Sequence, residues 1–259
     1  MNTKVNYSKQ NNMAEITLNR PEALNALDND MIASIIEALK DAGKDDAVRV
    51  VIIKGNGRAY CAGDDLVDMG TEAHPNPSDK VKEYYEGYPQ IVFAMKELEK
   101  PIIVAVHKYA LGAGFEIALA ADFIISSEEA KFGLPFVLRG LASGTYLLQQ
   151  RIGYHRAAKY LYLGEMFDAQ TAMQLGLLYE VTTTDELENK VKQLAERLAL
   201  SATRSIGLMK KAMHASAGLD YEQAFKLQTL STFASYHSED HKEGIQAFVE
   251  KREPKFTGK

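Results

Sequence analysis

The sequence predicts an α/β fold that ends in a purely helical extension, and two patterns indicate it. Strand-like and helix-like segments alternate over roughly the first 200 of the 259 residues, as they do where helices cover a sheet. The rest of the chain has helical patterning alone. We therefore expect an α/β core over residues 1–200 and a helical region over residues 201–259. The helical region packs either on its own core or on another subunit.

Local patterning justifies each element in chain order. Apolar and polar residues alternate over 14–18, which predicts a strand. Asp28 is a candidate N-cap for a helix whose apolar residues, from Met31 to Leu39, share one face. Short apolar runs predict further strands, at 49–54, 102–106, 123–126 and 178–181. Boundaries marked by glycine, proline or aspartate predict further helices, at 78–96 and 112–121 and then from about 143, 154, 168, 185, 202, 220 and 239.

Composition and charge narrow the function classes. The net charge is −5, so we expect neither a nucleic acid nor an anionic membrane as the main partner, because both require a dominant basic face. Cys61 is the only cysteine, so no intrachain disulfide can form, and we expect a reducing, cytoplasmic setting. The polar first residues predict no secretory signal. The apolar run over 102–125 is interrupted by charged residues and glycines, so no membrane span is expected.

Two turns contain small residues that would let a ligand approach the main chain. The first, 57–66, follows a predicted buried strand and contains Ala62 and Gly63. The second, 110–116, leads from a strand into a helix, whose first N–H groups lack partners and carry the positive end of the helix dipole. Such a terminus suits a developing anion. The alternatives are a glycine turn without a ligand and a helix start in which glycine serves close packing.

Glu116 is the candidate acid/base residue of the second turn. It lies in the first turn of a helix that is apolar on nearly every face, so we expect its carboxyl to be buried. A buried carboxylate is costly unless it is paired or functional. The alternative is that Glu116 only interacts with the helix dipole.

Six segments resemble the crotonase (enoyl-CoA hydratase/isomerase) superfamily, and they lie in the same order along nearly the whole chain. They are RPEALNAL (20–27), CAGDDL (61–66), ALGAGFE (110–116), ADF (121–123), FGLP (132–135) and AFVEKREPKF (247–256). The resemblance implies a crotonase-like spiral of repeated ββα units with a C-terminal helical trimerisation region. It also implies a homotrimer, often doubled to a hexamer.

The resemblance further implies that the substrate is a coenzyme A thioester and that no other cofactor or metal is needed. The thioester carbonyl would lie between the main-chain N–H groups of Asp64 and Ala113, on the turns that hold Gly63 and Gly112. Further residues would contact the coenzyme, namely Arg20, Ala23, Leu24, Ala62, Leu66, Phe248 and Lys251. An enolate formed from the thioester places negative charge on the carbonyl oxygen, which suits such donors.

The sequence departs from the hydratase pattern at one position. Hydratases of this family use two glutamates, and the position of the second is occupied here by Phe136, which cannot transfer a proton. We therefore expect Glu116 to be the only acid/base at a family position and Phe136 to wall the acyl pocket. The Asp64 carboxylate either replaces the missing group, or faces solvent or makes a hydrogen bond.

The family as a whole favours hydration of a 2-enoyl thioester, which is the nominal prediction, in fatty-acid or related acyl-CoA metabolism. Phe136 favours a reaction with one carboxylate or none, such as isomerisation or decarboxylation. A non-catalytic acyl-CoA-binding scaffold is the alternative from another class, although it would not need Glu116.

Other candidate residues have ordinary structural explanations. His237 and His241 lie four residues apart, a spacing that can bind a metal, but their charged neighbours indicate a solvated helix face. Tyr84, Tyr85 and Tyr88 either line the acyl pocket or pack in the core or on the surface.

Overall fold

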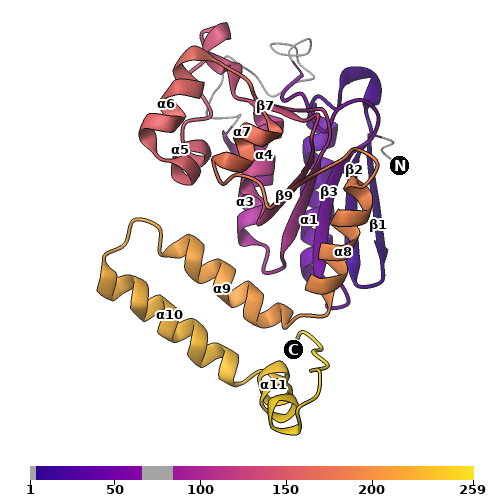
Figure 1. The fold of residues 1–259 in the computed structure, drawn as a ribbon, viewed down its shortest axis with the longest axis vertical. Coiled ribbons are helices and arrows are strands. Elements are labelled where there is room, and N and C mark those ends of the chain that lie inside the picture. The colour runs from indigo at the N-terminus through magenta and orange to yellow at the C-terminus, as the bar shows by residue number, and fades with distance from the viewer. Residues whose placement is uncertain (1–3, 66–83) are drawn as a thin grey trace.

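The computed structural model of the protein describes residues 4–65 and 84–259. Leu66, most of the predicted loop after the first turn, and the start of the helix predicted at 78 lie outside these residues. Figure 1 shows a twisted sheet flanked by helices, with a helical arm extending from one end of this body.

The main sheet has six strands in the order β1-β2-β3-β4-β6-β9. They are β1 (Val5–Gln10), β2 (Met13–Leu18), β3 (Val50–Gly55), β4 (Ile102–Val106), β6 (Phe123–Ser127) and β9 (Glu180–Thr182). β1 is antiparallel to β2, and the other neighbours are parallel. A second sheet, in the order β5-β7-β8, consists of β5 (Tyr109–Leu111), β7 (Lys131–Gly133) and β8 (Phe167–Asp168). The alternation of parallel strands and helices confirms the predicted α/β class.

Helices cover both faces of the main sheet. Those of the body are α1 (Asn29–Lys44), α3 (Pro89–Glu97), α4 (Ala113–Ala120), α5 (Leu147–Ile152), α6 (Tyr154–Leu163), α7 (Ala169–Gln174) and α8 (Leu187–Ala199). Two 3-10 helices, η1 (Pro21–Ala23) and η2 (Pro135–Arg139), lie between them in sequence. Asp28 caps α1 as predicted, because its side chain accepts a hydrogen bond from the Met31 N–H at 3.0 Å.

The central strands are apolar throughout because both of their faces are buried. Val51 and Ile53 of β3 face the larger core, which includes residues of α1, α3 and α4. Val50 and Ile52 face a smaller core formed with α8. The strand residues are thus used for packing, and the functional turns lie in the segments that follow the strands.

The arm consists of α9 (Thr203–Ala215), α10 (Tyr221–Tyr236) and α11 (Glu239–Glu250). Figure 1 shows α9 and α10 side by side, away from the sheet, and none of the residues of α10 is buried within the single chain. Arg49 fastens the base of the arm to the sheet. Its guanidinium donates to Thr203 Oγ1 and Phe256 O, at 2.8 Å each, and to Ser201 O.

The structure differs from the predicted secondary structure at one helix and at four strands that were not predicted, namely β1 and the three short strands of the second sheet. β1 was not predicted, because its residues 5–10 are mostly polar and exposed, as is common for an edge strand. The helix predicted over 78–96 is not continuous in its described part: the chain breaks at Gly87, and α3 begins only at Pro89. Proline favours the first position of a helix, so it marks a start here.

Candidate active site

A cavity of about 380 Å³ opens where the two predicted turns meet. Its lining comes from four stretches of chain that are distant in sequence, namely 62–64, 84–89, 111–112 and 135–143. Two of the stretches belong to the turns on which the sequence places donor N–H groups. The structure therefore joins the two turns around one cavity.

Main-chain hydrogen bonds hold the first turn against β5. The Cys61 N–H donates to Tyr109 O at 3.1 Å, and the Leu111 N–H donates to Cys61 O at 3.0 Å. On its other side the turn contacts Leu27, whose N–H donates to Gly63 O at 2.8 Å. The first turn is thus fixed from both sides by backbone pairing, which does not depend on side-chain identity.

Glycine allows the two turns to touch. A Cβ on Gly63 would lie 2.9 Å from Leu111 O and 3.3 Å from Ala113 N, and Gly63 has a φ of +98°. A Cβ on Gly114 would lie 2.7 Å from the Cys61 side chain and carbonyl oxygen. Side chains at these positions would push the turns apart, so the contact between them requires glycine.

The second turn presents a donor from the start of α4. Ala113 is the first residue of this helix, and its N–H makes no hydrogen bond to any of residues 4–65 or 84–259. The neighbouring Gly112 N–H donates to Gly133 O at 3.0 Å, and Gly112 O accepts from Phe115 and Glu116. The Ala113 N–H is therefore available beside Gly112, which lines the cavity, at the positive end of the helix dipole.

Glu116 is buried, with 6% of its surface exposed, as the sequence predicts. Its Oε2 accepts a hydrogen bond of 2.5 Å from the Tyr88 hydroxyl, which also lies 3.4 Å from Ser143 Oγ. Burial raises the pKa of Glu116, while the Tyr88 hydrogen bond opposes this rise. Burial and the nearby Glu116 charge raise the pKa of Tyr88, so its hydroxyl keeps its proton. The arrangement can hold and move one proton.

Phe136 and Asp64 both line the cavity, one with an apolar ring and the other with a carboxylate. Two atoms of the Phe136 ring lie 3.7 Å from where a Cβ on Gly112 would be, so the ring covers the second turn. Asp64 lines the cavity too, and its charge raises the pKa of Tyr88. Arg139 adds a positive charge at the rim, where its guanidinium donates to Pro135 O at 3.2 Å.

The segment 20–27 lies beside the first turn. The Ala62 N–H donates to Leu24 O at 3.0 Å, and Arg20 Nη1 lies 2.5 Å from Asp65 Oδ2. Ala23 ends η1 next to Leu24. The structure thus brings Arg20, Ala23 and Leu24 close to Ala62, and their contact with the coenzyme stays a prediction.

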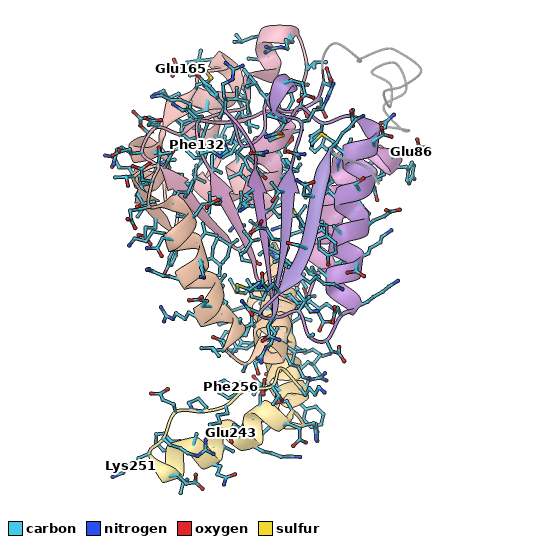
Figure 2. The ribbon with its side chains drawn as sticks, turned by 90° about the vertical axis from the view of Figure 1, so that its right-hand side faces the viewer. Glu86, Phe132, Glu165, Glu243, Lys251 and Phe256 are labelled. Atoms are coloured by element: carbon cyan, nitrogen blue, oxygen red, sulfur yellow. The ribbon has the colours of Figure 1, made fainter. Side chains whose placement is uncertain are left out.

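The structure does not bring the predicted tail residues to the cavity within one chain. Phe248 lies on α11 and is 85% exposed, and Lys251 follows this helix in the left-handed conformation. Figure 2 places Lys251 at the far end of the arm, opposite the end of the body that holds Phe132 of β7. A contribution of Phe248 or Lys251 to coenzyme binding stays a prediction that would require a neighbouring copy of the chain.

Several residues of the site carried no clear signal in the sequence. Ser143 and Arg139 follow the FGLP segment without a motif of their own, and for Tyr88 the sequence favoured packing over the pocket. Asn25 was also missed. It is fully buried, its amide donates to the main-chain oxygens of Asn56, Ala59 and Tyr60, and its Oδ1 accepts from Arg20 N at 2.8 Å. An asparagine shortly after a proline is only a weak sequence signal for such a set of side-chain to main-chain hydrogen bonds.

Two other kinds of site are absent from the described residues. Within 4–65 and 84–259, no group of three or more histidine, cysteine, aspartate or glutamate residues is placed to hold a metal ion. No helix in this part of the chain combines the length and apolar character needed to cross a bilayer.

Comparisons with known proteins agree with the geometry. The family model for enoyl-CoA hydratase/isomerase matches residues 8–259. The chain is 35% identical to 1,2-epoxyphenylacetyl-CoA isomerase of Escherichia coli over 247 residues, which cover 94% of each chain. It is also 35% identical to 2,3-dehydroadipyl-CoA hydratase of the same organism, over 97% of this chain and 98% of that one. The crystal structure of an enoyl-CoA hydratase from Bacillus anthracis superposes with a TM-score of 0.91 at 29% identity, covering 99% of this chain and all of that one.

Proposed function

This chain belongs to the enoyl-CoA hydratase/isomerase family, and from that premise we propose that it is an enoyl-CoA isomerase. It would convert a 3-enoyl thioester, whose double bond joins carbons 3 and 4, into the 2-enoyl thioester, whose double bond joins carbons 2 and 3. Membership of the family shows that the protein is an acyl-CoA-processing enzyme with a crotonase fold, without specifying the reaction. The identity of the reaction is our inference from the groups around the cavity.

In the proposed reaction the thioester carbonyl lies between the N–H groups of Asp64 and Ala113. Glu116 takes a proton from carbon 2, the resulting charge moves to the carbonyl oxygen, and the protonated Glu116 returns the proton to carbon 4. One carboxyl is enough, because it is first base and then acid. Each main-chain donor that strengthens as the oxygen becomes negative lowers the barrier by about 3 kcal/mol.

The observation that carries the choice of reaction is the position of Phe136. The Phe136 ring lines the cavity and packs over the Gly112 turn, at the position where hydratases of the family carry their second glutamate. Water addition needs a group that holds and deprotonates water, and an aromatic ring does neither. Movement of a proton within the substrate needs no water, so it fits a cavity walled in this way.

A second candidate reaction is hydration of a 2-enoyl-CoA. Asp64 lines the same cavity and is close enough to Tyr88 to affect its pKa. Asp64 and Glu116 would then form an unusual pair of carboxylates, and several relatives are named as hydratases. Decarboxylation lacks an observation that favours it over these two.

The test is incubation of the purified protein with 2-enoyl and 3-enoyl thioesters of coenzyme A in heavy water, followed by mass spectrometry. Isomerisation gives the other enoyl isomer with no added water, and deuterium enters only to the extent that Glu116 exchanges its proton. Hydration gives a product heavier by one water. A protein that binds the thioesters but leaves both unchanged would overturn the proposal in favour of a non-catalytic acyl-CoA-binding role.

We also propose that the helical region 201–259 assembles the protein, as a homotrimer or as a hexamer formed from two trimers, in the cytoplasm. Large apolar side chains of α10 are exposed in the single chain, including Phe225, Leu230 and Phe233. A second copy of this chain would bury them. The same contact could bring Phe248 and Lys251 close to a neighbouring cavity.

A further inference from the structure

Tyr88 links the buried acid of the site to the cavity. The cavity lining includes Tyr88 and Ser143, but it does not include Glu116. The Tyr88 hydroxyl donates to Glu116 Oε2 at 2.5 Å and lies 3.4 Å from Ser143 Oγ. Because Tyr88 has only 9% of its surface exposed, this hydroxyl has little contact with bulk water that could weaken the bond.

The local fold fixes Tyr88 in this position. The helical conformation is interrupted at Gly87. Tyr88 is the N-cap residue of α3, and Pro89 is at its first helical position. α3 packs against α4, which carries Glu116. The tyrosine and the carboxylate therefore come from the N-terminal ends of two neighbouring helices that pack against each other.

We propose that Tyr88 is a positioning residue of the reaction: its hydroxyl binds one carboxylate oxygen of Glu116, keeps that carboxylate ionised, and directs the other oxygen to the substrate. This inference rests on the proposed role of Glu116 as the base. A buried carboxylate without a donor would bind a proton and lose its basic function, because burial disfavours the charged form. A short hydrogen bond from a neutral hydroxyl stabilises the ionised form without neutralising it.

Few other groups can set the ionisation of Glu116. Burial raises its pKa, and the Tyr88 hydrogen bond lowers it. Around this pair, Asp64 and Arg139 line the cavity, and the buried Cys61 thiol, whose pKa burial raises to about 12, packs against Gly114.

Titratable groups on the other elements packed against α4 are few. On α5, Arg151 donates to Leu119 O and Ala121 O at the opposite end of α4. On α3, Lys96 lies in the last turn, and β5 contributes Tyr109. Replacing Tyr88 should therefore change the pKa of Glu116 directly, because Tyr88 is the side chain that donates a hydrogen bond to it.

The experiment compares the pH dependence of kcat and KM for the wild-type protein and for Tyr88→Phe. Removing the hydroxyl raises the pKa of Glu116, so the acid limb of the kcat profile moves to higher pH. On that limb kcat falls roughly ten- to hundredfold, the equivalent of one hydrogen bond to a charged group, and it recovers as the pH rises. KM stays within about twofold, because Tyr88 acts through the base.

Tyr7→Phe is the matched control. The Tyr7 hydroxyl donates to Asp41 Oδ2 at 2.7 Å, so this variant also removes a tyrosine–carboxylate hydrogen bond, but between β1 and α1 and outside the cavity. Its kcat, KM and pH profile should equal those of the wild type. Replacement of Tyr88 by 3-fluorotyrosine serves as a second variant that keeps the ring and strengthens the donor, and it should move the acid limb to lower pH.

Two results would overturn the inference. One is an unchanged profile in Tyr88→Phe, and the other is an equal loss of kcat at every pH with no displacement in the fluorotyrosine protein. The Glu116→Gln variant separates this failure from failure of the proposed function. If Glu116→Gln remains active, Glu116 is not the base and the proposed reaction is wrong. If Glu116→Gln is inactive while both Tyr88 variants behave as wild type, only the role of Tyr88 is wrong.

Discussion

The Glu116 carboxylate is buried, lies on a helix whose other residues are apolar, and accepts a hydrogen bond from the Tyr88 hydroxyl. Replacing it with glutamine preserves shape and the acceptor for Tyr88 but removes the base. We expect Glu116→Gln to lower kcat by about 100- to 10,000-fold, the range of general acid–base catalysis, with KM nearly unchanged. Steady-state kinetics with the enoyl thioester that the wild type converts checks this. The exposed Glu128→Gln is the control, and it should leave both constants unchanged.

The same substitution should stabilise the fold at neutral pH. Burial raises the pKa of Glu116 above its value of 4.5 in an unfolded chain, so the folded state binds this proton more tightly. The free energy of unfolding therefore falls as the pH rises from the unfolded-state pKa to the folded-state pKa. Glutamine carries no such cost. We expect Glu116→Gln to raise the free energy of unfolding at pH 7, and with it the Tm.

Thermal unfolding of both proteins between pH 4 and pH 8 measures this difference. The Tm gap should close as the pH falls below 4.5, where Glu116 is protonated in both states. A gap that does not depend on pH would mean that the glutamine acts through packing and not through ionisation.

At the scale of elements, the contact between the two turns depends on Gly63. Alanine there would be strained at a φ of +98°, and its Cβ would lie 2.9 Å from Leu111 O. We expect Gly63→Ala to destabilise the fold by about 1–3 kcal/mol and to lower kcat, because the Asp64 and Ala113 N–H groups move apart. Chemical unfolding and steady-state kinetics give the two quantities.

Gly153→Ala is the matched control for this prediction. Gly153 also has a positive φ, of +81°, but a Cβ on it would meet no atom within 4 Å. The control should lose stability through backbone strain while kcat stays at the wild-type value. Equal losses of kcat in both variants would show that the turn contact is not what positions the donors.

How much of these elements could be predicted depends on where the signal lies. The buried strands, the Asp28 cap and the Gly112 helix start follow from residues adjacent in sequence, and the structure confirms them. The pairing of Tyr88 with Glu116 joins two helices separated in sequence by the two strands β4 and β5, so no local pattern reports it. β1 escaped prediction because an exposed edge strand needs no apolar face, and its pairing with β2 supplies the signal only in three dimensions.

At the scale of the whole molecule, the arm exposes apolar surface that a lone chain leaves uncovered. Phe233 on α10 is 65% exposed and lies among other large apolar side chains of that helix. We expect the wild type to have a mass of three or six times 28.7 kDa by light scattering. Phe233→Glu should shift it toward 28.7 kDa, because a buried unpaired charge is costly at an interface.

The control for assembly is Gln193→Glu on α8, which adds the same residue to an exposed position of the body. It should keep the wild-type mass. If Phe233→Glu also keeps the wild-type mass, α10 is not the assembly surface. If the wild type itself has a mass of 28.7 kDa at all concentrations, the assembly proposal is wrong.

Arg49 has a mechanical consequence for any such assembly. It binds the base of the arm, whereas the distal tip near residue 219 is about 20 Å away along the 13 residues of α9. The far half of α9 is also held to the body, because Lys210 Nζ donates to Asp122 Oδ2 at 2.8 Å and Lys211 pairs with Glu99. Both halves of α9 are therefore fixed, so the body of each chain sets the direction in which α10 presents its apolar residues to another copy.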